Sequence, residues 1–168
     1  MRTARLTAWT IALLVGVVGC GASKPAAAPQ RIRSFAATDT PVTTTGVTAA
    51  DGGWRIERSA PGTVPLFEVE NPGIEYTTLS YRAHLRSEGV QGKAYLEMWV
   101  RVPGRGEFFS RGLAQPIEGT QGWASYEIPF FLNEKGVRPD LVKLNVAFEG
   151  AGTVWIKDVE LLHTPLAG

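Results

Sequence analysis

The feature that most constrains the fold of this chain is an alternation of apolar and polar residues that recurs in short segments after Gly53. Successive side chains of a β-strand point to opposite faces, so a period of two predicts strands with one buried face. No apolar set with helical spacing persists over two turns in this part of the chain. Turn signals such as Pro-Gly and Asn-Pro-Gly separate these segments, which is typical of two packed antiparallel sheets. We therefore predict an all-β fold, a two-sheet antiparallel β-sandwich.

The expected strands follow from these turn signals. They span residues 54–60, 64–70, 74–86, 93–102, 123–132, 141–148 and 153–162. One face of these strands carries the apolar side chains that we expect to form the core. The expected core residues are Leu79, Tyr81, Ala83, Leu85, Leu96, Met98, Val100, Tyr126, Ile128, Phe130, Leu144, Val146, Phe148, Val154 and Ile156.

Residues 1–19 have the layout of a secretory signal peptide. Arg2 and Arg5 precede an uncharged, largely apolar run from Leu6 to Gly19. A membrane-spanning helix is the alternative, but such a helix needs about 20 apolar residues and this run is shorter. We therefore expect a signal peptide.

The segment Val17-Val18-Gly19-Cys20 closely resembles the lipobox of bacterial lipoproteins. The resemblance implies cleavage before Cys20 and attachment of a diacylglycerol to its sulfur. A conventional signal peptide followed by a chance cysteine is the alternative. Residue 21 is Gly rather than Asp, which resembles lipoproteins that are not retained at an inner membrane. The expected location is secreted and lipid-anchored at the bacterial cell envelope, in the outer membrane if the organism has two membranes.

Composition limits the partners of the mature chain. Removing residues 1–19 takes two of the 17 Lys and Arg residues and none of the 16 Asp and Glu residues, so 15 basic residues face 16 acidic ones and the net charge is −1. A near-neutral chain without a basic stripe argues against nucleic-acid binding, because that affinity comes largely from neutralising phosphates. Cys20 is the only cysteine, which excludes an intramolecular disulfide and a cysteine metal site.

The domain boundaries rest on composition. Residues 20–50, which begin with the lipidated cysteine, are rich in Ala, Pro, Thr and Ser and predict a flexible linker, with residues 41–47 as a candidate first strand. We place the β-sandwich at residues 51–164 and a short tail at residues 165–168.

One predicted strand carries an unusual outer face. In the predicted strand 93–102, the expected core residues alternate with Tyr95, Glu97, Trp99 and Arg101. Tyr95 and Trp99 are about 13 Å apart by strand rise. Sugars offer flat apolar C–H faces and many hydroxyls, so aromatic residues beside charged ones suit a glycan site. Neighbouring strands could add Arg82, His84 and Asn145.

The alternative is that the same face is purely structural. The loop that follows, residues 103–112, could cover Trp99, and Glu97 and Arg101 could be cross-strand ion-pair partners. Exposed aromatic residues gathered in one patch would favour binding instead.

The C-terminal half resembles the closing strands of galactose-binding-like jelly rolls, a group that includes many carbohydrate-binding modules. The resemblance covers residues 53–162 in outline. It rests on a Trp that opens a strand, a Gly turn, and a last strand of the form aromatic-Ile-x-Asp-Val-x-Leu. The matching residues are Trp123, Gly152, Trp155, Ile156, Asp158, Val159 and Leu161. It implies a jelly-roll sandwich, and it specifies the fold better than the function, because such folds host many roles.

Some members of that group hold a structural calcium near a sheet edge, using an aspartate of the last strand and an acid from the first strands. Asp158 is the matching aspartate, and Glu68 is the candidate partner. Calcium takes 6–8 oxygen ligands, and the sequence names too few of them. The alternative is that Asp158 stabilises a turn or pairs with Lys157 or an arginine. No other cofactor is expected.

The sequence contains no recognisable catalytic motif. His84 and His163 are the two histidines, they lie far apart, and no nucleophile elbow or spaced set of metal ligands accompanies them. The Glu-x-Asp-x-x-Glu strand of jelly-roll glucanases is absent, which leaves Glu97 and Glu127 as a conceivable carboxylate pair.

We therefore predict an envelope lipoprotein whose β-sandwich is a non-catalytic binding module, with carbohydrate as the leading ligand class. A structural or protein-interaction lipoprotein with no sugar site is the alternative. The expected partners are the membrane, through the lipid on Cys20, and a glycan or an envelope protein.

Overall fold

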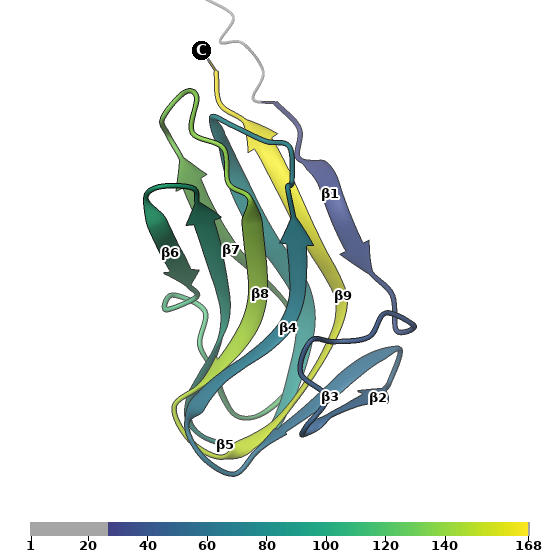
Figure 1. The fold of residues 1–168 in the computed structure, drawn as a ribbon. Helices are drawn as coiled ribbons and strands as arrows, with labels where there is room; N and C mark the ends of the chain where they lie inside the picture. Colours follow the sequence, from purple (N-terminus) through teal and green to yellow (C-terminus); the bar gives the residue numbers. More distant parts are fainter. Residues whose placement is uncertain (1–26, 168) are drawn as a thin grey trace, which may run out of the picture.

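The computed structural model describes residues 27–167, which form nine β-strands and contain no helix (Figure 1). Within this range no helical segment has the length and hydropathy to cross a membrane. The expected signal peptide and Cys20 lie outside the described residues. The strands are β1 (Gln30–Phe35), β2 (Val47–Ala50), β3 (Gly53–Arg58), β4 (Gly62–Glu70), β5 (Thr77–Val102), β6 (Gly106–Arg111), β7 (Ile117–Leu132), β8 (Leu141–Phe148) and β9 (Gly152–Pro165).

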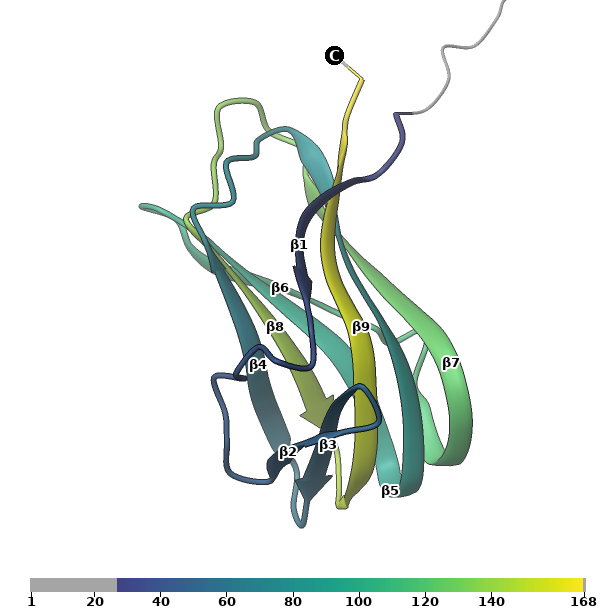
Figure 2. The same cartoon turned by 90° about the vertical axis from the view of Figure 1, so that its right-hand side faces the viewer.

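All strand pairs are antiparallel, and one long strand, β5, belongs to both layers of the sandwich. Residues 77–88 of β5 pair with β9 and, on the other side, with β7. Residues 94–102 pair with β8 and β6 instead. The first layer, called here the β9 sheet, contains β2, β3, β9, the first half of β5 and β7, with β1 on β9. The second layer, the β8 sheet, contains β4, β8, the second half of β5 and β6 (Figure 2).

The change of sheet within β5 takes place at residues 87–92, which the sequence predicted to be a turn between two strands. Gly89 and Gly92 there have φ angles of 60° and 68°, a left-handed region that favours glycine. The pairing with β7 shifts register at Ser87 and Val90. Backbone pairing therefore continues through the bend, and one 26-residue strand replaces the two predicted ones.

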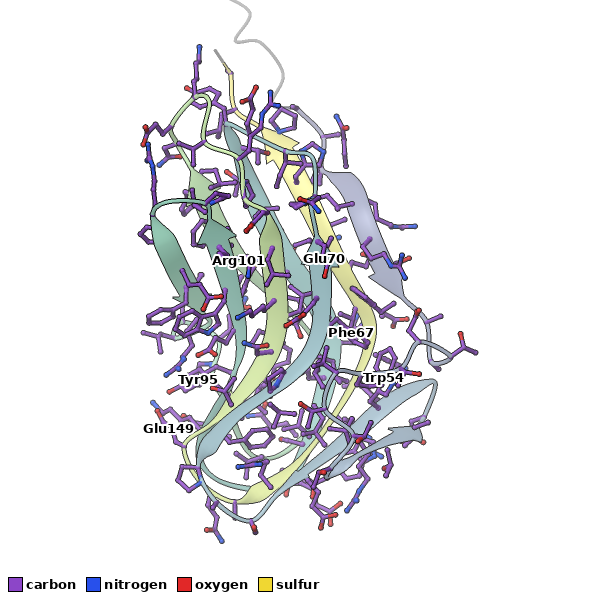
Figure 3. The ribbon with its side chains drawn as sticks, viewed as in Figure 1. Trp54, Phe67, Glu70, Tyr95, Arg101 and Glu149 are labelled. Atoms are coloured by element: carbon purple, nitrogen blue, oxygen red, sulfur yellow. The ribbon has the colours of Figure 1, made fainter. Side chains whose placement is uncertain are left out.

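The core lies between the two sheets, as the alternation predicted. All fifteen expected core residues are buried except Phe130, which is half-buried and packs against the core. The hydroxyl of the fully buried Tyr81 has no hydrogen-bond partner, and burial raises the pKa of this phenol. An aromatic cluster joins the layers: Phe67 of β4 stacks on Phe35 of β1 at 4.0 Å and meets Trp54 of β3 edge-on at 4.8 Å (Figure 3).

The folded domain begins earlier than the expected boundary at residue 51. β1 and β2 lie within the segment assigned to the linker, and β1 pairs with residues 159–163 of β9. The segment 41–47 forms a strand only at its last residue, Val47. Within the described residues the buried core runs from Phe35 to Leu161, so β1 and β2 belong to the folded domain. The fold class is confirmed: the protein is an antiparallel β-sandwich.

Candidate functional site

The richest chemistry lies on the outer face of the β8 sheet, where strand register aligns polar and aromatic side chains in two rows. One row runs across β4, β8, β5 and β6 as Pro65, Asn145, Glu97 and Arg111. The adjacent row runs as Glu68, Lys143, Trp99 and Phe109. Figure 3 shows two further residues of this face on β5, Tyr95 and Arg101.

Glu97 organises the first row, and it is buried rather than exposed. Only 1% of it is accessible to solvent. Trp99 Nε1 donates to its Oε1 at 2.8 Å, and Arg111 Nε donates to its Oε2 at 2.8 Å, with Arg111 Nη2 bonded to the same oxygen. Thr63 Oγ1 and Asn145 Nδ2 also donate to Oε1, at 3.3 and 3.5 Å. A carboxylate with its acceptors occupied in this way orients its neighbours and does not itself bind a ligand.

Trp99 is the aromatic residue that this network holds in place. Its indole N–H is fixed by Glu97, and Phe109 stacks on it with ring centroids 5.0 Å apart and planes inclined by 27°. Trp99 lines a groove of about 330 Å³ and Phe109 does not, so the phenyl ring supports the indole from outside the groove. The groove residues are Val42, Thr63, Pro65, Glu68, Glu97, Trp99, Glu107, Lys143 and Asn145.

The polar groups of the groove are mainly hydrogen-bond acceptors. Lys143 Nζ is bound to Glu107 at 2.6 Å, so the positive charge of its ammonium group is neutralised. Among residues 27–167, Glu68 makes no salt bridge, and the Oδ1 atom of the buried Asn145 has no hydrogen-bond partner. Three carboxylates and one ammonium group line the groove, and Arg111 compensates Glu97 from outside it. This balance favours neutral ligands that donate hydrogen bonds.

The structure corrects the expected role of Tyr95. Its side chain is 4% exposed, and its hydroxyl donates to Glu149 Oε1 at 2.9 Å. Burial and the Glu149 carboxylate together raise the pKa of this phenol. Tyr95 is therefore not a second aromatic platform 13 Å from Trp99, because it is buried and its hydroxyl is bound to Glu149 of the β8–β9 connection.

Arg101 lies beyond the groove on the same face. It is exposed, and its Nε donates to Asp140 Oδ1 at 2.8 Å. This hydrogen bond from Arg101 lowers the pKa of the Asp140 carboxyl. The alternative prediction was that Glu97 and Arg101 are cross-strand ion-pair partners. Glu97 does form such a pair, with Arg111 of β6, whereas Arg101 pairs with Asp140 in the β7–β8 connection.

Arg82 and His84 lie on the opposite side of the molecule. They precede the bend of β5, so their side chains point outward from the β9 sheet. Arg82 Nε donates to Glu127 Oε2 at 2.8 Å, and His84 Nδ1 lies 3.0 Å from Asp158 Oδ2. Of the three additional candidates, only Asn145 adjoins Trp99 and Glu97. The change of sheet within β5 separates the other two.

Comparison with known proteins identifies the fold of this chain. No family model matches the chain, and no curated protein matches its sequence. Among solved structures, it is similar to the CBM22-1 xylan-binding domain from Paenibacillus barcinonensis Xyn10C, with a TM-score of 0.52 and 11% identity over 85% of this chain and 100% of that chain. At this identity the likeness shows the fold alone, a β-sandwich of jelly-roll type. The same jelly roll recurs in infectious bursal virus-derived T=1 particles, with a TM-score of 0.51 and 14% identity over 91% of this chain and 36% of that chain.

In this jelly roll Asp158 and Glu68 cannot share a calcium ion. Asp158 lies on the outer face of the β9 sheet beside His84, and Glu68 lies on the outer face of the β8 sheet. Within residues 27–167 no group of three or more His, Cys, Asp or Glu side chains could hold a metal. Asp158 has a φ of 52° where the β5–β9 register shifts, and its carboxylate contacts His84 rather than the expected Lys157 or an arginine.

The jelly roll also separates the two carboxylates that were considered as a catalytic pair. Glu97 belongs to the β8 sheet, whereas Glu127 pairs opposite Arg82 on the outer face of the β9 sheet. The layers of the sandwich lie between them. These two residues therefore cannot act on one glycosidic bond.

Sequence reasoning missed the contribution of β6. Residues 103–112 were treated as a loop, yet Glu107, Phe109 and Arg111 lie on the site face and contact Lys143, Trp99 and Glu97. The alternation of Glu107, Phe109 and Arg111 was the sequence signal that could have predicted this strand. The adjacent Phe108 and the glycines around the segment obscured it, because two consecutive aromatic residues do not show which one faces the core.

Proposed function

We propose that this protein is a non-catalytic carbohydrate-binding module and that the groove of the β8 sheet binds its ligand. The observation that carries the proposal is the fixed indole of Trp99, held by Glu97 and supported by Phe109. An aromatic wall suits the C–H face of a sugar ring, and its immobility reduces the entropy lost on binding. The fold supports the same function class, because the xylan-binding domain shares it.

Charge and size narrow the ligand class. Lys143 compensates Glu107 and Arg111 compensates Glu97, so among residues 27–167 Glu68 is the groove carboxylate that makes no salt bridge, and its negative charge opposes an anionic sugar. A neutral glycan offers hydroxyl donors to these acceptors. At about 330 Å³ the groove lies at the small end of ligand pockets, which suits a short segment of a chain.

Trp99→Ala should lower affinity for neutral polysaccharides at least tenfold, because the sugar face loses its stacking partner. The measurement is retardation in affinity gels containing xylan, mixed-linkage β-glucan or galactomannan. Trp123→Ala is the matched control, since Trp123 is a 38% exposed Trp on the β9 sheet and should leave retardation unchanged. Trp99→Ala also loses a hydrogen bond to a carboxylate, so it should destabilise the fold by about 2 kcal/mol, and folding must be verified by circular dichroism.

Absence of wild-type retardation on every neutral polysaccharide would contradict the glycan proposal. Equal losses for Trp99→Ala and Trp123→Ala would show that the groove is not the binding site. The first result would favour the structural or protein-interaction alternative, and the second would place the sugar site elsewhere on the domain.

We also propose that the mature protein is anchored at the cell envelope through a lipid on Cys20. The support is the lipobox-like segment Val17-Val18-Gly19-Cys20. Labelling of expressing cells with a radioactive fatty acid should mark the wild-type chain and leave Cys20→Ala unmarked. Equal labelling of both chains would exclude the anchor.

A further inference from the structure

A second groove lies at one end of the sandwich, and its character is apolar. This end groove has a volume of about 340 Å³ and is formed by the β5–β6 and β7–β8 connections with the adjoining strand ends. Phe108 of β6 and Phe131 of β7 line it and are 46% and 60% exposed. Its other apolar lining residues are Val102, Phe130, Leu132 and Val137. Two half-exposed phenylalanines at one place indicate a contact surface.

The end groove and the start of the domain lie at the same end of the molecule. Thr77 pairs with Leu132 at the end of β7 and with Pro165 at the end of β9, and Gln30 of β1 pairs with His163 two residues before Pro165. Figures 1 and 2 show the β7–β8 connection, the start of β1 and the end of β9 on this side. Cys20 precedes Gln30 by ten residues, which span at most about 35 Å.

Charge around the end groove suits an anionic surface. Glu134 accepts two hydrogen bonds from Arg105, at 2.6 and 2.8 Å, and Glu75 accepts two from Arg138, at 3.1 and 3.3 Å. Lys135, in the same connection, makes no salt bridge among the described residues, and its Nζ lies 5.1 Å from the ring centre of Tyr76. The carboxylates are thus compensated, and one ammonium group remains free.

We propose that the end groove is a membrane-contact surface in which Phe108 and Phe131 enter the interface of a lipid bilayer. Phenylalanine side chains at the edge of a protein insert between headgroups and acyl chains, and a free lysine is attracted by anionic headgroups. The inference rests on the proposed anchor, since a lipid on Cys20 would hold this end within reach of the bilayer. The glycan groove, on the side of the sandwich, stays open in this orientation.

The test uses residues 27–168, which contain the core from Phe35 to Leu161 and lack Cys20. This segment should co-sediment with vesicles of phosphatidylethanolamine and phosphatidylglycerol, and more weakly with phosphatidylcholine vesicles. The double variant Phe108→Ser/Phe131→Ser should reduce the partition coefficient at least tenfold, because two aromatic side chains no longer leave water. Leu113→Ser is the matched control: Leu113 is 68% exposed and lies outside the end groove, so binding should not change.

Three results would overturn the proposal: no binding of the wild-type segment to either vesicle, equal effects of the double variant and Leu113→Ser, or a wild-type dimer that the double variant abolishes without any vesicle binding. The last result would assign the end groove to a second copy of the chain. Failure of the glycan proposal is separate, because Trp99→Ala should keep vesicle binding and the double variant should keep polysaccharide retardation. Fatty-acid labelling of Cys20 tests the anchor independently.

Discussion

Replacement of Arg111 by methionine should destabilise the domain by about 3 kcal/mol. Arg111 binds both Nε and Nη2 to the Oε2 atom of Glu97, a side chain that is 1% exposed. Without the guanidinium group the carboxylate stays buried with only the weaker dipoles of Trp99, Thr63 and Asn145 to compensate it. A buried charge without its counter-charge is among the most costly defects that one substitution can create.

The measurement is equilibrium unfolding in urea. Arg82→Met provides the matched control, because Arg82 Nε lies at the same 2.8 Å from Glu127 but the two side chains are 38% and 39% exposed. Exposed pairs contribute little, so this variant should cost less than about 1 kcal/mol. The double variant Arg111→Met/Glu97→Gln should recover part of the Arg111→Met loss, because a neutral amide removes the uncompensated charge. Equal costs for Arg111→Met and Arg82→Met would show that Glu97 is compensated by other means.

Phe67→Ala should cost about 4 kcal/mol of unfolding free energy. Phe67 is 3% exposed, stacks on Phe35 and meets Trp54 edge-on, so it joins β4 of one sheet to β1 and β3 of the other. Truncation removes these contacts and leaves a cavity between the two sheets. Because the strands of each sheet are held by their backbone pairing, the sheets cannot easily move together to fill this cavity.

Urea unfolding again provides the measurement, with Phe67→Leu and Phe131→Ala as comparisons. Phe67→Leu keeps most of the volume and should cost less than half as much as Phe67→Ala. Phe131 is 60% exposed, so its truncation should change stability by no more than about 0.5 kcal/mol. A cost for Phe67→Ala as small as that for Phe131→Ala would mean that the aromatic cluster does not hold the layers together.

The candidate site was predicted unevenly, and the residues show why. Trp99 and Asn145 were named from the outward positions of their strands, and they line one groove. Tyr95, from the same pattern, is buried under Glu149, and Arg82 and His84 belong to the other sheet. Alternation tells which side of a strand is polar. It does not tell whether that side is later covered or which way the sheet faces.

The sequence by itself determined the all-β fold and the inward face of the strands that it predicted, because the two-residue period of a strand is local and survives any arrangement of the layers. Only the tertiary structure decided what the outward faces do. The donors to Glu97 at residues 111, 63 and 145 lie 14, 34 and 48 positions away along the chain, and the pairing of β4, β8, β5 and β6 brings them together. Strand order and register arise from packing of the whole core, so the burial of Glu97 and the orientation of Trp99 could be seen only once the sandwich was assembled.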